Sequence, residues 1–403
     1  MTQNALGPKG RFYQAKRLKE IPLCITFAKF AAYMKKARVL ILLLLTAAIT
    51  GCRSSIGPKE ESGAIVIDIP MRNESLTPQK PARADIIASL DTIRLGGTVD
   101  ETLLSEVSDI KFSSDRIFVL SADVLCIFDL DGRYISTIQR KGRGPGEYQH
   151  LSDFDIVEDQ KLIYALDTQA QQVIIYDFGG KYKRHFPMDS WTTVDFVVLP
   201  NGHMLLMNLF GSNQRGIFEA DENGQNQRIL YEVESDYQRL TFADKYLIHI
   251  NDSVIGCIGQ EDTDYIFHYK NDTLIPAYKI RTDIVMPQEY RQKVSAAQDQ
   301  DLVYTKLQYW ENHRYMGITL VSNSNFVFCM YDKDNNLTTR YYRSELAEPD
   351  STLDFVPSYQ YCYKERLVSV YDAETILQYE GMQKDFPDIT IDSNPVLVIT
   401  SLK

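Results

Sequence analysis

The segment of residues 139–148, QRKGRGPGEY, combines three glycines with three basic side chains, as a loop that binds phosphate would. A phosphate loop of the nucleotide-binding kind needs Gly-Lys-Ser/Thr at the start of a helix, and the segment has neither the motif nor a helical pattern. Glycine permits unusual φ angles, so we predict an architectural turn between two strands. A ligand-binding role stays open as the alternative for the side chains of Arg140, Lys141, Arg143, Glu147 and Tyr148.

No other combination of residues has the spacing of a catalytic or metal site. The six histidines, at positions 150, 185, 203, 249, 268 and 313, show no HExxH pattern, so a zinc site lacks support. No G-x-S-x-G motif marks a nucleophilic serine. The sequence therefore predicts no catalytic residue, no metal ligand and no cofactor.

Four cysteines, Cys126, Cys257, Cys329 and Cys362, each lie in an apolar or aromatic stretch. An exported protein can pair such residues in disulfides. Because cysteine in strands usually behaves as a small buried hydrophobe, we favour buried thiols.

The N-terminal region has the pattern of an export signal. From Met34 the chain has a basic start, an apolar run too short to span a bilayer comfortably, and small residues before Cys52. The ending ITGC resembles a bacterial lipobox, which implies lipid attachment at Cys52. Residues 1–33 fit an export signal poorly, so Met34 is a plausible true start.

These features divide the chain into an extension and signal over 1–51, a lipidated tether over 52–84 and a folded part over 85–403. Without residues 1–51, which hold nine Lys/Arg and one acidic residue, the formal net charge falls from −11 to −19. Such a charge opposes binding to nucleic acid or to an anionic lipid surface. We expect attachment to the membrane through the lipid alone.

A repeat of 40 to 45 residues organises the folded part. Its units start at Asp109, Asp153 and Asp195, which are 44 and 42 residues apart. Each unit shows an alternating strand, a polar turn, a more apolar strand and a strand that closes on an Asp/Gly-type turn, where positive φ angles are needed. This period is typical of propeller blades.

Less regular units follow at about 242–280, 314–343 and 355–380, and residues 283–312 have helix-compatible stretches that predict an insertion. We predict an all-β fold: a six-bladed β-propeller of four-stranded antiparallel blades with a short helical insertion. Strand-like segments at 86–95 and 395–402 are expected to flank the array and to close the ring by pairing.

The glycine-rich segment, with Ser152 and Asp167 in the strands that follow, resembles NHL-type repeats. The chain from residue 85 onward, with the lipobox upstream, is similar to the six-bladed propeller lipoproteins of gut-type Gram-negative anaerobes. Asp167 is similar to the aspartate of the NHL pattern, for which we favour a structural hydrogen bond. Lactonase-type propellers place calcium on the axis, which implies Asp109, Asp153 and Asp195 as possible ligands. We favour the simpler interpretation that these aspartates accept hydrogen bonds from backbone amides at strand entries.

The resemblance implies a fold and no activity. We expect a lipoprotein anchored in the outer membrane, on either its periplasmic face or its surface face. Its propeller is expected to be a scaffold that binds a glycan, a peptide or an envelope protein. The alternative is a calcium-dependent lactonase-like or other hydrolase that uses the axial funnel. Trp191, Tyr309 and Trp310 are able to stack on sugars but are as readily core residues.

Overall fold

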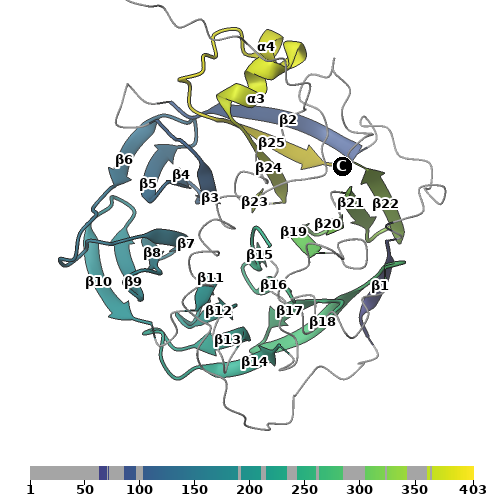
Figure 1. Cartoon of the computed structure of the whole chain (residues 1–403), viewed down its shortest axis with the longest axis horizontal. Coiled ribbons are helices and arrows are strands. Elements are labelled where there is room, and N and C mark those ends of the chain that lie inside the picture. Colours follow the sequence, from purple (N-terminus) through teal and green to yellow (C-terminus); the bar gives the residue numbers. More distant parts are fainter. Residues whose placement is uncertain are drawn as a thin grey trace, which may run out of the picture. The chain divides into compact units, whose positions relative to one another are not determined.

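The computed structural model describes residues 63–69, 71, 86–96, 103–188, 192–209, 215–233, 243–259, 263–284, 305–322, 325–342, 361–363 and 365–403. All of them belong to one compact unit, Ser54–Lys403. Their strands form six sheets arranged around a central axis (Figure 1). The fold is therefore a six-bladed β-propeller of four-stranded antiparallel blades, as the repeat predicts.

The first three blades follow one another along the chain, each running from its innermost to its outermost strand. Blade 1 consists of β3 (Val107–Phe112), β4 (Arg116–Ser121), β5 (Val124–Asp129) and β6 (Tyr134–Ile138). Blade 2 consists of β7 (Leu151–Val157), β8 (Leu162–Asp167), β9 (Gln172–Asp177) and β10 (Tyr182–Pro187). Blade 3 consists of β11 (Thr193–Val198), β12 (Met204–Asn208), β13 (Gly216–Ala220) and β14 (Arg228–Glu232).

The fourth and fifth blades repeat this order, and the sixth combines both ends of the propeller. Blade 4 consists of β15 (Leu247–Asn251), β16 (Val254–Ile258), β17 (Tyr265–Lys270) and β18 (Thr273–Arg281). Blade 5 consists of β19 (Thr305–Glu311), β20 (Tyr315–Ser322), β21 (Asn325–Asp332) and β22 (Leu337–Tyr342). Blade 6 consists of β23 (Tyr361–Tyr363), β24 (Arg366–Tyr371), β25 (Val396–Leu402) and β2 (Ile87–Arg94).

The turn between the two outer strands of a blade is built in the same way in blades 1, 2 and 3. In each, the side chain of an aspartate at the end of the third strand, Asp129, Asp177 or Asp221, accepts two backbone N–H bonds from the turn. A glycine with φ between 73° and 82° follows three residues later. The Asp/Gly signal of the sequence therefore marks the hairpins correctly.

The ring closes as predicted. Strand β2 is the outermost strand of blade 6 and pairs antiparallel with β25, from Ile87 opposite Leu402 to Arg94 opposite Val396. Because the first and last parts of the propeller share one sheet, the edge of β25 that faces away from β24 is covered by β2.

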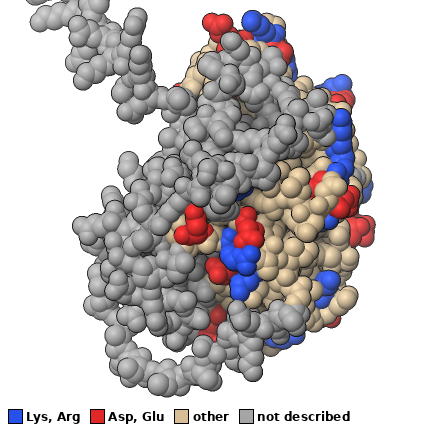
Figure 2. Space-filling view, turned by 90° about the vertical axis from the view of Figure 1, so that its right-hand side faces the viewer, with Lys and Arg blue, Asp and Glu red and all other residues tan. Residues whose placement is uncertain are grey.

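Strand β1 (Ile65–Asp68) lies inside the segment that the sequence assigned to the tether, yet it is part of the folded unit. It pairs in parallel with β18 and makes blade 4 five-stranded. Its Ile67 is 1% exposed and packs into the core, and Asp68 pairs with Arg281, whose Nη2 lies 2.7 Å from Oδ2. Figure 2 shows basic and acidic side chains next to one another on this side of the molecule. The folded chain therefore begins well before residue 85.

The core lies between the blades. Strand β8 shows the arrangement: Ile163 and Ala165 pack against blade 1, whereas Tyr164 and Leu166 pack against blade 3. Both faces of such a strand are buried, which explains why the second strand of each repeat is apolar without alternation.

Two expectations about the later chain differ from the structure. The innermost strand of blade 5 is Thr305–Glu311, which the sequence analysis placed in the insertion. The helices that the structure describes, α3 (Ala373–Gln378) and α4 (Glu380–Asp385), follow β24 in blade 6 instead. An irregular strand with a bulge shows little alternation, which explains the first error.

The predicted signal, Met34, Cys52, Trp191 and most of the insertion lie outside the described residues. No helix of the described part is long and apolar enough to cross a membrane.

Candidate functional site at the propeller axis

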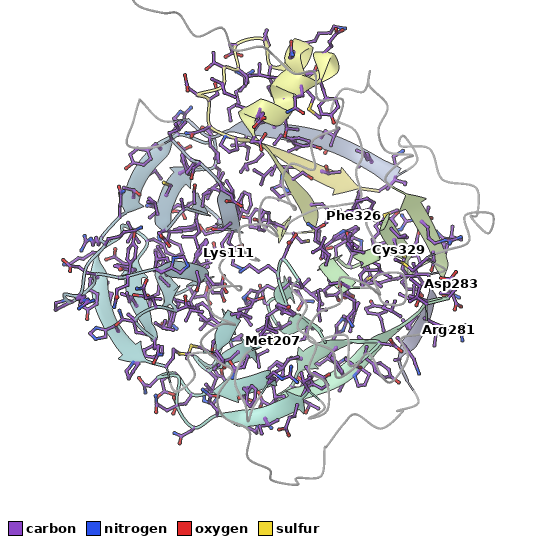
Figure 3. All side chains as sticks on the ribbon, viewed as in Figure 1. Lys111, Met207, Arg281, Asp283, Phe326 and Cys329 are labelled. Atoms are coloured by element: carbon purple, nitrogen blue, oxygen red, sulfur yellow. The ribbon has the colours of Figure 1, made fainter. Side chains whose placement is uncertain are left out.

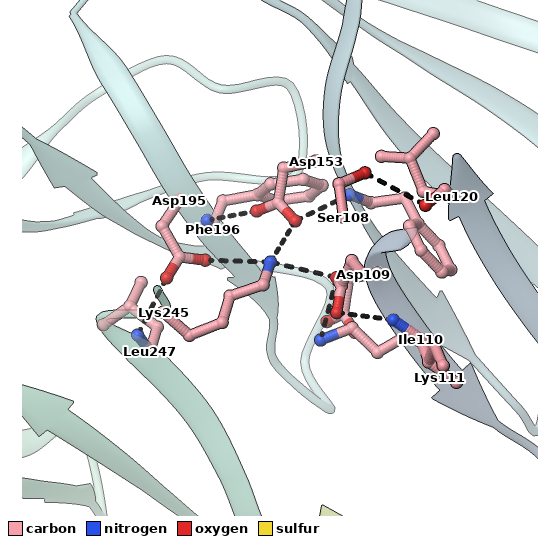
Figure 4. A network of polar contacts seen from close by, with 12 residues as sticks. Ser108, Asp109, Ile110, Lys111, Leu120, Asp153, Asp195, Phe196, Lys245 and Leu247 are labelled. Atoms are coloured by element: carbon pink, nitrogen blue, oxygen red, sulfur yellow. Dashed lines mark hydrogen bonds and ion pairs between the residues drawn. The ribbon is translucent and has the colours of Figure 1, made fainter. Parts of the chain in front are cut away.

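The three aspartates that start the repeats meet near the axis around one lysine (Figure 4). Lys245 precedes β15 in blade 4, and its Nζ lies 2.9 Å from Asp109 Oδ2 and 3.8 Å from Asp195 Oδ1; it also pairs with Asp153. The aspartate side chains are 1–4% exposed and that of Lys245 is 16% exposed. Three blades thus supply carboxylates, and the fourth supplies their counter-ion.

Two of these carboxylates also tie their blade to the next one. Asp153 Oδ2 accepts the N–H of Phe196 in blade 3 at 3.2 Å, and Asp195 Oδ2 accepts that of Tyr246 in blade 4 at 2.6 Å. Asp109 accepts the N–H of its own neighbour Ile110 at 2.8 Å, and Asp153 likewise accepts that of Phe154 at 2.9 Å. The predicted role as amide acceptors is therefore observed, with amides of the same strand and of the adjacent blade as partners.

The protonation of the cluster reflects burial and charge together. Burial raises the pKa of Asp153, and the neighbouring Asp195 and Asp109 add to this effect against the opposing charge of Lys245. For Lys245, burial alone would lower the pKa, but the three aspartates raise it well above its ordinary value. The lysine is therefore held in its charged form.

A second set of polar side chains lies next to the first along the innermost strands. Asp155 Oδ2 accepts the N–H of Val198 at 2.8 Å and lies 3.0 Å from His249 Nε2. Burial alone would raise the pKa of Asp155, but the charge of His249 and its hydrogen bond, with Lys111, lower it to about 2. Lys111 extends toward the centre of the ring in Figure 3, and its Nζ is 3.6 Å from Asp109 Oδ2.

Blades 5 and 6 contribute uncharged groups close to this cluster. Gln308 Nε2 donates to Asp244 Oδ2 at 2.6 Å, one residue before Lys245. The pKa of Tyr361 is raised well above its ordinary value by burial and by the charge of Asp109. All six blades therefore place polar side chains close to the axis.

This arrangement bears on metal binding. Calcium prefers six to eight oxygen ligands, and Asp109, Asp153 and Asp195 are oxygen donors of that kind. The ammonium group of Lys245 already occupies the position between them, so a cation would have to displace it. The described residues contain no group of three or more His, Cys, Asp or Glu side chains arranged for a metal ion.

The glycine-rich loop lies between β6 and β7, at the outer part of blades 1 and 2. Glu147 Oε2 accepts the N–H of Gly144 at 2.8 Å, and the buried Tyr148 donates its hydroxyl to the carbonyl of Ile138 at 3.2 Å. Gly146 has a φ of 76°, and a Cβ there would lie 2.7 Å from the ring of Tyr182. These contacts are those of a turn, and Arg140, Lys141 and Arg143 are exposed on its outside.

The remaining candidates have structural surroundings. Asp167 accepts the N–H of Gln149 at 2.7 Å, which fixes the chain after the glycine loop. Tyr309 and Trp310 are buried in the core, 5% and 2% exposed. The four cysteines of the described part are free thiols, and Cys126, Cys257 and Cys329 are buried.

A second charged cluster, which no motif of the sequence indicates, lies between blades 4 and 5. Glu311, whose side chain is 3% exposed, lies 2.9 Å from His268 Nε2 and 2.6 Å from Lys333 Nζ, and it accepts the hydroxyl of Tyr278 at 2.7 Å. Burial would raise the pKa of Glu311, but His268 and Lys333 lower it to about 2. These residues come from four strands or turns of unrelated sequence, so no spacing in the sequence joins them.

A family model described as a domain of unknown function, DUF4934, matches residues 64–401, which is nearly the whole propeller. The chain belongs to the DUF4934 family. A comparison of this DUF4934 protein with curated proteins found no match.

Solved structures similar to this DUF4934 protein include one from Bacteroides fragilis NCTC 9343, whose name describes it as exported. It is 15% identical, with a TM-score of 0.67, over 84% of this chain and 99% of that one. A DUF4221 family member from Bacteroides vulgatus is 9% identical with a TM-score of 0.49, covering 79% and 97% of the two chains. Virginiamycin B lyase from Staphylococcus aureus is 10% identical with a TM-score of 0.40, covering 77% and 99%. Only the first has a TM-score above 0.5, and at its identity it bears on the fold alone.

Proposed function

We propose that this DUF4934 protein is an envelope-anchored scaffold that binds a glycan, a peptide or a partner protein. The observation that carries the proposal is that the charged side chains at the axis form ion pairs with one another, although Asp195 Oδ1 has no hydrogen-bond partner among the described residues. Lys245 forms ion pairs with three carboxylates. Asp155, which pairs with His249, also accepts the backbone N–H of Val198. Groups used in this way stabilise the ring and are not poised for acid–base chemistry, which supports binding over catalysis.

The attachment to the envelope rests on Cys52 and its lipobox-like surroundings. The first strand that the structure describes, β1, begins at Ile65, 12 residues (53–64) beyond Cys52. A lipid on Cys52 would attach the propeller to the outer membrane. The Bacteroides fragilis protein that shares this fold is itself named as exported, which is in keeping with the proposal.

The attachment is tested by labelling cells with radioactive palmitate. We expect the label on the wild-type protein and not on the Cys52→Ala variant, which should leave the membrane fraction. Equal labelling of both proteins would refute lipid attachment at Cys52. Cys362→Ala is the control, since it removes one of the other cysteines.

The binding function is tested by a thermal-shift screen of the protein with calcium, a chelator, and panels of glycans and peptides. A ligand that binds only the folded state raises the melting temperature by mass action. We expect a shift with a glycan or peptide that persists in the chelator. A calcium-dependent shift that the chelator reverses, together with measured turnover of a lactone, would replace the scaffold by the hydrolase alternative.

A further inference from the structure

Exposed cationic side chains gather on the outer part of blades 1 and 2. Three belong to the glycine-rich loop, Arg140, Lys141 and Arg143, and three to the start of the outermost strand of blade 2 and the turn before it, Lys181, Lys183 and Arg184. We call these six residues the basic rim. They stand out because the formal net charge of the whole chain is −11.

The chain segments that carry the two halves of the basic rim are in direct contact. The ring of Tyr182 lies against Gly146, and the hydroxyl of Tyr176 donates to the carbonyl of Gly146 at 2.9 Å. Figure 1 shows the chain between β6 and β7 at the same edge of the ring as β10. The loop and the start of the strand therefore form one surface, whereas the guanidinium group of Arg184 donates to Asn223 Oδ1 and Glu222 O of blade 3 at 3.0 and 3.3 Å.

The loop holds its shape through bonds that do not involve its arginine side chains. The N–H of Gly142 donates to Tyr148 O and that of Tyr148 to Arg140 O, both at 2.9 Å. Tyr148 anchors the loop through its buried ring, and Glu147 is used for the N–H of Gly144. The guanidinium groups are therefore presented by a preorganised turn, which lowers the entropy cost of binding.

The carboxylates of this region neutralise only part of the basic rim. Asp123 lies 2.9 Å from Lys141 Nζ and also pairs with His150, and Asp177 lies 2.8 Å from Lys183 Nζ. Within the described part of the chain, Arg140, Arg143 and Lys181 have no ion pair. A positive surplus remains on a protein that is otherwise acidic.

We propose that the basic rim binds an acidic polysaccharide, that is, a sugar chain carrying carboxylate or sulfate groups. This deepens the proposed scaffold function and rests on it. Arginine pairs well with planar or tetrahedral oxyanions, and the spread of cations over a loop and a strand suits an extended polyanion. The ring of Tyr182 lies between the two groups of cations and adds an aromatic edge for sugar contacts. Its hydroxyl oxygen is 2.7 Å from His185 Nδ1.

A membrane is the less suitable partner, because the large negative charge of the rest of the protein is repelled by an anionic bilayer. A flexible chain is able to follow the rim without approaching the acidic surfaces. An acidic peptide would meet the same cations, but it lacks the sugar faces that suit the aromatic ring.

The experiment measures binding of heparin to the full-length protein at several salt concentrations, for the wild type and two double variants. Arg140→Glu/Arg143→Glu reverses two charges of the rim, whereas Lys270→Glu/Lys384→Glu makes the same change of net charge at exposed lysines elsewhere. Melting temperatures establish that both variants fold. We expect salt-sensitive heparin binding that is about tenfold weaker in the first variant and within about twofold of the wild type in the second.

Equal weakening in both variants, or no heparin binding at low salt, would overturn the proposal. Tighter binding to polyglutamate than to heparin would assign the rim to acidic peptides, and binding to phosphatidylserine vesicles would assign it to a membrane; either result also overturns it. The scaffold function is judged separately: if a neutral glycan or a protein partner binds while heparin does not, the scaffold stands and only the basic rim fails.

Discussion

Replacing Lys245 by methionine tests whether the axis is held together by its internal counter-ion. The change keeps the length of the side chain and removes the charge, which leaves Asp109, Asp153 and Asp195 buried and close together. Removing one partner of a buried ion pair costs about 3–5 kcal/mol, because the remaining charge loses its compensation. The exposure of the three aspartate side chains, 1–4%, places this cluster in that class.

The loss should depend on pH in a defined direction. Burial already raises the pKa of Asp153, and without the opposing charge of Lys245 the pKa of this carboxyl rises further. A carboxyl group with a raised pKa in the folded state destabilises the protein once the pH exceeds its unfolded-state value, and the cost grows up to the folded-state value. Lys245→Met should therefore lose less stability at pH 5 than at pH 8.

Urea unfolding at these two pH values measures the free energy directly. Lys270→Met is the matched control, since Lys270 is exposed and carries no ion pair in the described structure. The variant should also gain stability from calcium, because Asp153 and Asp195 then lose their lysine and Asp109 keeps only Lys111. A Lys245→Met protein as stable as the control at both pH values would refute the counter-ion role.

Three further outcomes are expected. The pKa of Glu311 is lowered from 4.5 to about 2, so its charged form adds stability that is present above pH 4.5 and is lost toward pH 2. The Glu311→Gln variant should therefore lose about 3 kcal/mol of unfolding free energy near neutral pH. In an acid titration followed by circular dichroism, its stability should change less than that of the wild type between pH 4.5 and pH 2. Gly146→Ala should lower the unfolding free energy by about 1–3 kcal/mol, since φ is 76° and the Tyr182 ring would lie 2.7 Å from the new Cβ; an unchanged urea midpoint would contradict this. Deletion of residues 1–96 removes β2 and opens the edge of β25, so light scattering should detect aggregation that is absent from a deletion of residues 1–53.

The repeat predicted the fold because the physical signals that define a blade are local. The Asp/Gly turns specify the outer hairpins, as at Gly132 with its φ of 82°, and the apolar runs specify strands buried on both faces. Closure was predictable as well, since a ring needs partners for its terminal strands, and β2 and β25 pair as expected. Strand β1 was missed because a parallel edge strand of four residues has too little pattern to separate it from a tether.

The site was predictable only in part. Asp109, Asp153 and Asp195 could be found because they occupy repeated positions, and the preference for amide acceptors over calcium ligands follows from that repetition. Lys245 could not be found, because it precedes its strand in a blade whose repeat is degenerate and meets the aspartates only when the ring closes. The pairing of Glu311 with His268 could not be predicted either, since 43 residues and a blade boundary separate them.

The departure of blade 4 from the repeat explains how three equivalent aspartates can share one axis. Identical carboxylates from every blade would repel one another in a buried space, and burial would drive them to take up protons. Here three blades keep the aspartate, which two of them use to bond the next blade, and the fourth provides a lysine whose charge offsets them. Lys245 is thus the internal counter-ion of the axis, and its contribution to stability is what the Lys245→Met experiment measures.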